Sequence, residues 1–290
     1  FIFNILSTII FLIFLKPFAK LVRWMVPGDD AEVATGAIYI KRETMPDTGK
    51  TIRLLEKEVA HQVGLVKLLF QNAVDAVKTS DQQKVKKVVA LETATDDLDS
   101  TIMEYLLFLS KRKMTKGQAQ RLGILMNVSN ALENLGDTGK RVGGAGEKLN
   151  EHGMKIQKQA ALELEEVHDR LDESLTEIEL ALNASKAPDH QRLAHIREDA
   201  DRIVARIHNT YLKEITQKHL NLYSGPLFGD ALTNMEHANH MVHRIGLMLA
   251  GKGMQGAPIS RSGVVKQVRK KKTAKKYSRA KKKTKTMPRH

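Results

Sequence analysis

The chain has 290 residues, no cysteine and a formal net charge of +14. The absence of cysteine excludes a disulfide framework and thiolate metal sites. Residues 261–290 hold 14 of the 47 Lys and Arg and no Asp or Glu, which leaves 33 basic against 33 acidic residues elsewhere. The composition therefore argues against a basic domain face and for a basic tail that seeks a polyanion.

The first 26 residues contain the most apolar stretch of the chain. Residues 1–15 carry no charge, and basic and aromatic side chains then appear among apolar ones: Lys16, Lys20, Arg23 and Trp24. A complete membrane span needs about 20 apolar residues, so we expect residues 1–26 to be the end of a truncated transmembrane helix with an interfacial anchor. The basic flank places the following residues in the cytoplasm. A buried core helix is the alternative, whereas a signal peptide would begin with basic residues.

Residues 27–47 are predicted to be a linker, with a short extended piece at Ala37–Ile40. Beyond them, apolar residues recur every three or four positions up to about Lys252, which predicts six helices. The six apolar faces include Leu55 and Phe70, Leu91 and Leu98, Leu125 and Leu132, Leu171 and Leu182, Leu193 and Ile207, and Met235 and Val242. Gly143, Gly144 and Gly146 should weaken the third helix toward its end, since glycine costs about 1 kcal/mol per helix position relative to alanine.

The six helices look like one unit duplicated. The string ALENLG at Ala131 lies 100 residues before ALTNME at Ala231, late in the third helix of each set. This repeat predicts an all-α domain at residues 48–252, made of two tandem three-helix bundles at 48–152 and 153–252. The remaining residues, 253–290, hold few apolar side chains and should form a disordered basic tail.

Acidic side chains follow the apolar faces of the second and third helices. They are Glu92, Asp96 and Asp99 in one helix, and Glu133 and Asp137 in the other. Their spacing puts each set on one helix face, and antiparallel packing of the two helices would bring the sets together. Carboxylates that approach one another need protonation, basic partners or a cation, so these five residues are candidate metal ligands. The alternative is an ordinary solvated face with Lys140 and Arg141 as ion partners.

A second group of donors lies in the sixth helix: Glu236, His237, His240 and His243. Imidazole suits zinc, iron or nickel better than magnesium or calcium. Scattered surface histidines explain the same pattern, and that interpretation is favoured. The chain also contains no phosphate-binding Gly-rich loop, because VGGAGEK at Val142 lacks the required spacing and follows a helix. We therefore expect no catalytic activity.

The segments LETATDDLDSTIMEYLLFLS and NALENLGDTGKRV resemble the two motif helices of the PhoU domain. In that family two three-helix bundles stand in tandem, and E/D-xxx-D motifs bind metal ions in some members. The resemblance implies that Glu92 with Asp96, and Glu133 with Asp137, hold Fe, Mn or Zn. The second half departs from the motif, since Thr233, His237 and Arg202 replace acidic residues there, which puts a second metal cluster in doubt.

The N-terminal FIFNILSTIIFLIFLKPFAKLV resembles the last membrane helix of bacterial sodium-dependent phosphate cotransporters. That resemblance implies the C-terminal regulatory portion of a sodium:phosphate symporter in the cell inner membrane, with the helical domain cytoplasmic and sodium and phosphate bound outside this chain. Its partners would be the upstream transporter helices, anionic lipids through the tail, and a further copy of the chain in an oligomer. One alternative is a soluble PhoU-type regulator of phosphate uptake. The other, a nucleic-acid-binding module, is disfavoured because the tail has a single aromatic residue, Tyr277.

Overall fold

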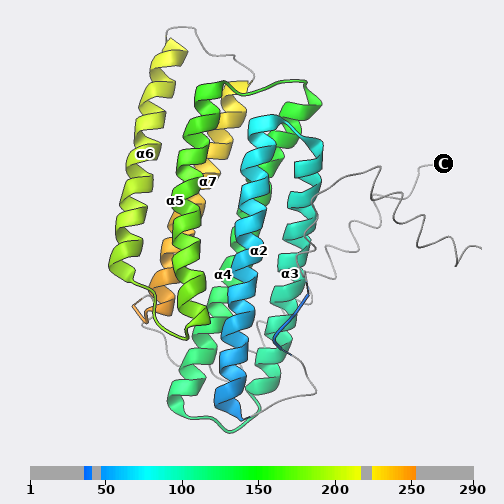
Figure 1. Ribbon diagram of the computed structural model, residues 1–290, viewed down its shortest axis with the longest axis vertical. Coiled ribbons are helices and arrows are strands. Elements are labelled where there is room, and N and C mark those ends of the chain that lie inside the picture. Colours follow the sequence, from blue (N-terminus) through cyan, green and yellow to red (C-terminus); the bar gives the residue numbers. More distant parts are fainter. Residues whose placement is uncertain (1–35, 41–46, 217–223, 253–290) are drawn as a thin grey trace, which may run out of the picture. The chain divides into compact units, whose positions relative to one another are not determined.

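In the computed structural model, residues 36–40, 47–216 and 224–252 are described (Figure 1). Within these ranges the chain forms six helices and no strand, so the predicted helix number and order are confirmed. The helices are α2 (Thr48–Thr79), α3 (Gln82–Leu109), α4 (Lys116–Glu151), α5 (Lys158–Asn183), α6 (His190–Thr216) and α7 (Ser224–Leu249).

Short polar side chains fix where the first three helices begin. The carboxylate of Asp47 accepts from the Lys50 backbone N–H at 3.0 Å, and that of Asp81 accepts from Gln83 N–H at 2.7 Å. At the start of α4, Thr115 and Gln118 form a reciprocal capping box. These caps satisfy N–H groups that have no partner inside the helix, so each helix starts at a defined residue.

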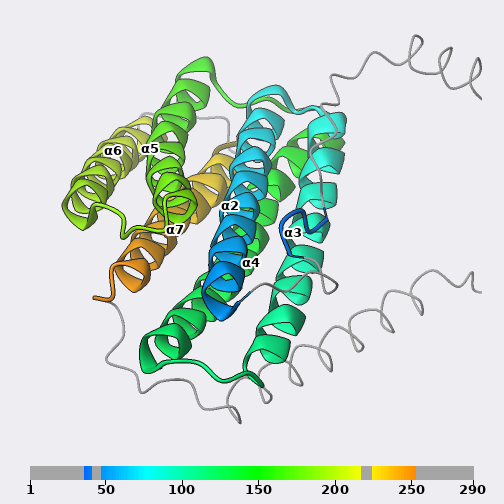
Figure 2. The same ribbon diagram turned by 60° about the horizontal axis from the view of Figure 1, so that its bottom comes forward.

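The helices form two three-helix bundles that pack against each other (Figure 2). The first contains α2, α3 and α4, and the second contains α5, α6 and α7. The bundles meet where α2 packs on α5 and α4 packs on α7, while α3 and α6 make their main contacts within their own bundle. Each contact between bundles therefore joins helices at corresponding positions of the two halves, which agrees with the predicted duplication.

Two faces of α2 are buried because this helix packs on α3, α4 and α5. One face carries the predicted apolar stripe, including Leu55, Val59 and Val66, and the second carries Leu65 and Leu69, all with no exposed surface. Burying both faces removes apolar surface from water on each side, and each Å² of buried apolar surface stabilises the fold by about 25 cal/mol. This makes α2 the central element of the first bundle.

Glycines on α4 allow the neighbouring helices to approach closely. A Cβ atom at Gly139 would lie 2.2 Å from Leu69 Cδ2, and one at Gly146 would lie 2.6 Å from the backbone of Ala76. The glycines do not end the helix, because α4 continues to Glu151. Tertiary packing on α2 outweighs the low helix propensity of glycine here.

Several predicted features lie outside the described residues: the truncated transmembrane helix and anchor of 1–26, most of the 27–47 linker, and the tail of 253–290. Among the helices that are described, none combines the length and apolar character that a bilayer crossing requires. Residues 36–40 are described, and they bend instead of forming the short extended piece expected at Ala37–Ile40. Their backbone N–H groups turn toward a buried carboxylate of α2.

Two alanine substitutions on α4 separate packing from helix propensity. We expect Gly146→Ala to lower the free energy of unfolding by about 1–3 kcal/mol, because the new methyl group collides with the α2 backbone. The control is Gly144→Ala, where a Cβ would have no atom within 4 Å. That substitution should raise the free energy of unfolding by up to about 1 kcal/mol. Denaturant unfolding of the full chain measures both, and equal effects of the two substitutions would contradict the packing argument.

Candidate functional site

The predicted approach of the two acidic helix faces is partly realised, since α3 and α4 pack directly on each other. Glu92 is buried at 7% exposure, and its Oε1 accepts from Lys140 Nζ of α4 at 2.8 Å. The ion pair gives the buried carboxylate a basic partner inside the bundle. For Glu92 the alternative hypothesis therefore holds, since Lys140 is its ion partner. Arg141, the other suggested partner, instead donates to Thr138 Oγ1 at 2.7 Å and to Asn234 Oδ1 at 3.1 Å.

Asp99 belongs to a buried polar contact among three helices. Its Oδ1 accepts from the Ser129 hydroxyl of α4 at 2.9 Å, and that hydroxyl oxygen lies equally close to Gln62 Oε1 of α2. The Gln62 amide also donates to the Ser129 carbonyl at 3.3 Å. All three residues are at most 2% exposed. This contact links α2, α3 and α4 and fixes their register, because buried polar groups need their partners.

The other three predicted ligands, Asp96, Glu133 and Asp137, are half-buried. Asp137 points into a groove between α4 and α7, which joins the two bundles and has a volume of about 550 Å³. The groove is lined by Asn127, Asn130, Ala131, Asn134, Asp137, Thr138, Arg141, His237, Met241, Arg244 and Met248. Glu92 and Asp99 are thus buried against α4, whereas Asp137 faces the second bundle.

In the described residues these carboxylates do not gather into one cluster. Across residues 36–40, 47–216 and 224–252, no three His, Asp or Glu side chains gather closely enough to hold a metal ion. The two buried carboxylates already have partners in Lys140 and Ser129. The shared cation site at Glu92, Asp96, Asp99, Glu133 and Asp137 therefore stays a prediction.

The donors of α7 face three different surroundings. His240 Nε2 lies 2.9 Å from Asp201 Oδ1 of α6, whereas His237 lines the groove against α4. Burial lowers the pKa of His243, and the nearby Arg197 guanidinium lowers it further, so this imidazole favours the neutral form. His237, His240 and His243 therefore have different neighbours and do not form one group of ligands.

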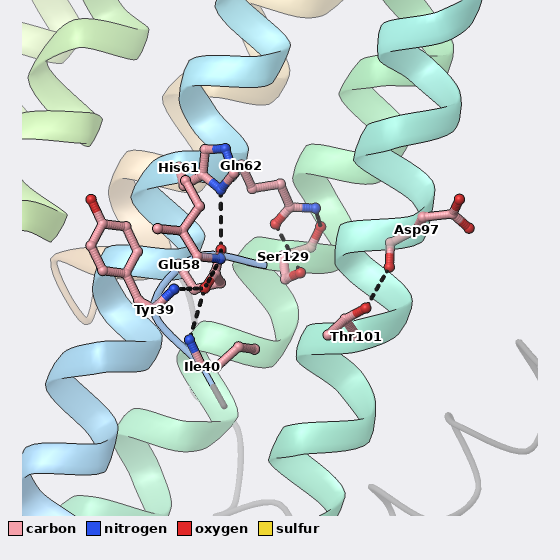
Figure 3. A network of polar contacts seen from close by, with 9 residues as sticks. Tyr39, Ile40, Glu58, His61, Gln62, Asp97, Thr101 and Ser129 are labelled. Carbon is pink, nitrogen blue, oxygen red and sulfur yellow. Dashed lines mark hydrogen bonds and ion pairs between the residues drawn. The ribbon is translucent and has the colours of Figure 1, made fainter. Parts of the chain in front are cut away.

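Sequence reasoning missed the most highly connected carboxylate, Glu58 of α2, which is completely buried. Its Oε2 accepts from the successive backbone N–H groups of Ile38 at 3.0 Å, Tyr39 at 2.6 Å and Ile40 at 3.0 Å (Figure 3). His61 Nδ1 lies 3.1 Å from the other carboxylate oxygen. Successive N–H groups that converge in this way form an anion-binding concavity, and here a side chain of the same chain occupies it.

The surroundings of Glu58 favour its charged form. Burial raises the pKa of Glu58, but the hydrogen bonds from His61 and from the three N–H groups outweigh burial, so the pKa lies below its ordinary value. Only one sequence signal could have indicated this site: Glu58 and Gln62 are polar residues four apart on a helix face that continues as Leu65 and Leu69. The partners are backbone groups, which no sequence motif marks.

Comparison with known families and structures adds an independent test. Residues 59–144 match the PhoU domain. The match covers α3 and parts of α2 and α4, including the five predicted metal ligands but not Glu58. No protein with a curated description matches the chain.

Two solved structures share the fold. PhoU from Pseudomonas aeruginosa matches with a TM-score of 0.62 at 16% identity, covering 70% of this chain and 95% of that protein. The phosphate transport system regulatory protein PhoU from Streptococcus pneumoniae matches with a TM-score of 0.62 at 14% identity, covering 74% of this chain and all of that one. The described bundle therefore has a PhoU-like fold. These matches give no support to the resemblance between residues 1–26 and a cotransporter helix.

The contact between Glu58 and residues 38–40 predicts a specific pH dependence. Because the pKa of Glu58 is lowered by folding, its contribution to stability is present above the ordinary pKa of about 4.5 and is lost as the pH falls through the folded value. We expect Glu58→Gln to lower the free energy of unfolding at pH 7 by about 1–3 kcal/mol. The deficit should shrink as the pH falls below about 4.5. Denaturant unfolding of the full chain between pH 3 and 7 measures it.

Glu147→Gln is the matched control, because Glu147 is exposed on α4. It should change the free energy of unfolding by less than about 0.5 kcal/mol at every pH. A Glu58→Gln deficit that stays constant down to pH 3 would show that the charge of Glu58 does not stabilise this contact.

A metal titration tests the predicted cation site. The site requires that Mn²⁺, Fe²⁺ or Zn²⁺ raise the melting temperature of the full chain, because a ligand that binds only the native state stabilises it. Lys140→Met removes the cation that now neutralises Glu92, so the rise should be larger in that variant. Glu133→Ala combined with Asp137→Ala should abolish the rise, and Glu147→Ala should not. Unchanged melting temperatures in both the native chain and Lys140→Met would rule the site out.

Proposed function

We propose that this protein regulates phosphate transport as a PhoU-type regulator. The observation that carries the proposal is the PhoU domain match at residues 59–144 within a six-helix fold like that of the S. pneumoniae phosphate transport system regulatory protein. The chain acts through binding, and we assign it no catalytic role. Its partner is the phosphate transporter whose activity it adjusts from the cytoplasmic side.

The extent of the structural matches favours a regulator over a portion of a transporter. The fold covers 95% of one PhoU chain and all of the other, so the bundle corresponds to essentially whole PhoU proteins. The six helices thus match nearly the full length of both PhoU chains. The regulator hypothesis therefore takes precedence over the symporter hypothesis.

A second candidate remains, and a specific sequence feature supports it. The uncharged run of residues 1–15 and its basic flank are typical of a membrane span and its cytoplasmic anchor. In this candidate the chain is the C-terminal regulatory part of a sodium:phosphate symporter in the inner membrane. The bundle would then act on transporter helices that precede it, and sodium and phosphate would bind outside this chain.

A regulator must respond to an effector, and we place that response in the groove between α4 and α7. The groove joins the two bundles, so a molecule bound there can alter how they pack. Arg141 and Arg244 line it, and neither forms an ion pair with a carboxylate in the described part of the chain. The groove thus offers two guanidinium groups to an anion, and its volume falls in the usual range for small-molecule sites.

Phosphate uptake in cells tests the proposed function. In cells that lack the protein, the rate of labelled phosphate uptake should stay high at millimolar external phosphate, whereas the native chain should reduce it several-fold. Arg141→Ala combined with Arg244→Ala should leave the protein folded and remove this reduction, because an anionic effector loses both guanidinium partners. Arg170→Ala is the control, since Arg170 lies on α5 and pairs with Glu173 of the same helix.

The same assay separates the two candidates. A chain that lacks residues 1–26 should still restore regulation if it acts as a separate regulator, and should fail if it is part of a transporter. Uptake that is identical with and without the protein at every phosphate concentration would contradict both.

A further inference from the structure

Exposed cations gather at one end of the first bundle. This end is formed by the starts of α2 and α4 and the α3–α4 connection, which lie at the bottom of Figure 1, together with the α5–α6 connection, which lies higher on the left. Residues of three of these segments line one depression of about 860 Å³, so they adjoin in space. We call six of the exposed basic residues here the basic end: Lys50, Arg53, Lys111, Lys113, Lys116 and Lys186. Lys57, which also lines the depression, lies over the ring of Tyr39 instead.

The cations of the basic end form no ion pairs with the described part of the protein. Within the described ranges, none of the six forms an ion pair, whereas basic residues elsewhere often do. At the opposite end of the bundle, Lys78 pairs with Glu165 at 2.8 Å, and Lys84 pairs with Asp75 at 3.0 Å. The opposite end also has exposed lysines without an ion pair in the described residues, namely Lys86, Lys148, Lys155 and Lys158. What distinguishes the basic end is its larger set of exposed cations.

Acidic residues at the basic end are engaged in structural contacts. Asp47 accepts from the N–H groups that begin α2, and Asp189 does the same for α6. Glu56 is buried, and its two oxygens accept from Arg121 Nε at 2.6 Å and from the Ser185 hydroxyl at 2.5 Å. These carboxylates cap helix ends and pair with one guanidinium. Asp47 also interacts electrostatically with Lys50 and Arg53, but forms no ion pair with either in the described residues.

An exposed aromatic side chain lies beside these cations. Phe108, in the last turn of α3, is 42% exposed, and the Arg112 guanidinium lies 5.5 Å from its ring centre. Lys111 and Lys113 flank Arg112 in the chain. An exposed aromatic ring beside Lys and Arg is typical of surfaces that enter the boundary between lipid headgroups and acyl chains.

We propose that the basic end docks onto an anionic membrane surface, with Phe108 at the lipid boundary. The cations come from separate segments and spread over an end of the bundle, which suits the diffuse charge of a headgroup layer better than the narrow track of a nucleic acid backbone. The lipid phosphates would serve as the ion partners of these cations. This contact goes beyond the proposed function, which assigns the bundle a transporter and an effector but no lipid, and it is separate from the tail.

The absence of cysteine allows a fluorophore to be placed at single positions in the full chain. Gly117→Cys puts it at the basic end, where a Cβ has open space, and Lys155→Cys puts it on the exposed connection at the opposite end. The measurement is quenching by a headgroup-linked quencher in vesicles with 0 to 40% phosphatidylglycerol at physiological salt. We expect quenching at position 117 to rise with the anionic fraction to about threefold or more that at position 155.

Neutralising three cations tests whether the basic end causes this docking. Lys50→Gln, Lys113→Gln and Lys116→Gln together should weaken the docking equilibrium about 100-fold, since each Lys or Arg near an anionic surface contributes about fivefold. Lys86→Gln, Lys148→Gln and Lys158→Gln remove the same charge from exposed positions toward the other end and should leave quenching at position 117 unchanged. Phe108→Ser should partly reduce quenching at position 117.

Three outcomes would overturn the proposal. The first is equal quenching at positions 117 and 155. The second is quenching at 117 that ignores the anionic fraction or survives the first triple substitution. The third is loss of quenching at 117 when duplex DNA is added at physiological salt, which would assign the basic end to nucleic acid.

Discussion

The close approach of α4 to α2 requires that Gly146 carry no side chain, and Gly139 leaves room for Leu69. At these positions a single methyl group would overlap Leu69 or the backbone of Ala76. The approach brings Ser129 of α4 within hydrogen-bond distance of Gln62 and Asp99, and it buries the second apolar face of α2. Since α2 and α4 are also the helices that contact the second bundle, the relation between the two halves depends on the same pair.

Charged side chains inside the bundle mainly maintain its structure. Glu92, Asp99, Glu56 and Glu58 are all buried, and each has a partner: an ammonium, a hydroxyl, a guanidinium or backbone N–H groups. Removing one partner from such a group leaves its desolvation uncompensated. These contacts select one packing of the helices, and they explain why acidic residues beside an apolar face need not indicate a metal.

The sequence was sufficient to predict six helices in two sets of three, because the 3.6-residue period is explicit in residues such as Leu55, Leu98 and Val242. It also left open the pairing of Lys140 with a carboxylate, which the structure places on Glu92. The glycine contacts were not predictable from the sequence. Helix propensity alone predicts that Gly146 destabilises α4, and only the position of α2 shows that a larger residue would not fit there. The contact of Glu58 was missed because its partners are backbone groups, and the basic end was missed because distant segments of a chain with a neutral body converge there.

The contact between Glu58 and residues 38–40 also has a mechanical consequence. A tension applied to the chain on the N-terminal side of Ile38 reaches the bundle first at Glu58, well inside α2, and only afterwards at the cap residue Asp47. Three N–H groups share that load on one carboxylate, and α2 packs on three neighbouring helices. A pull from the N-terminal side is therefore carried first by Glu58, inside α2, and not by the first turn of that helix.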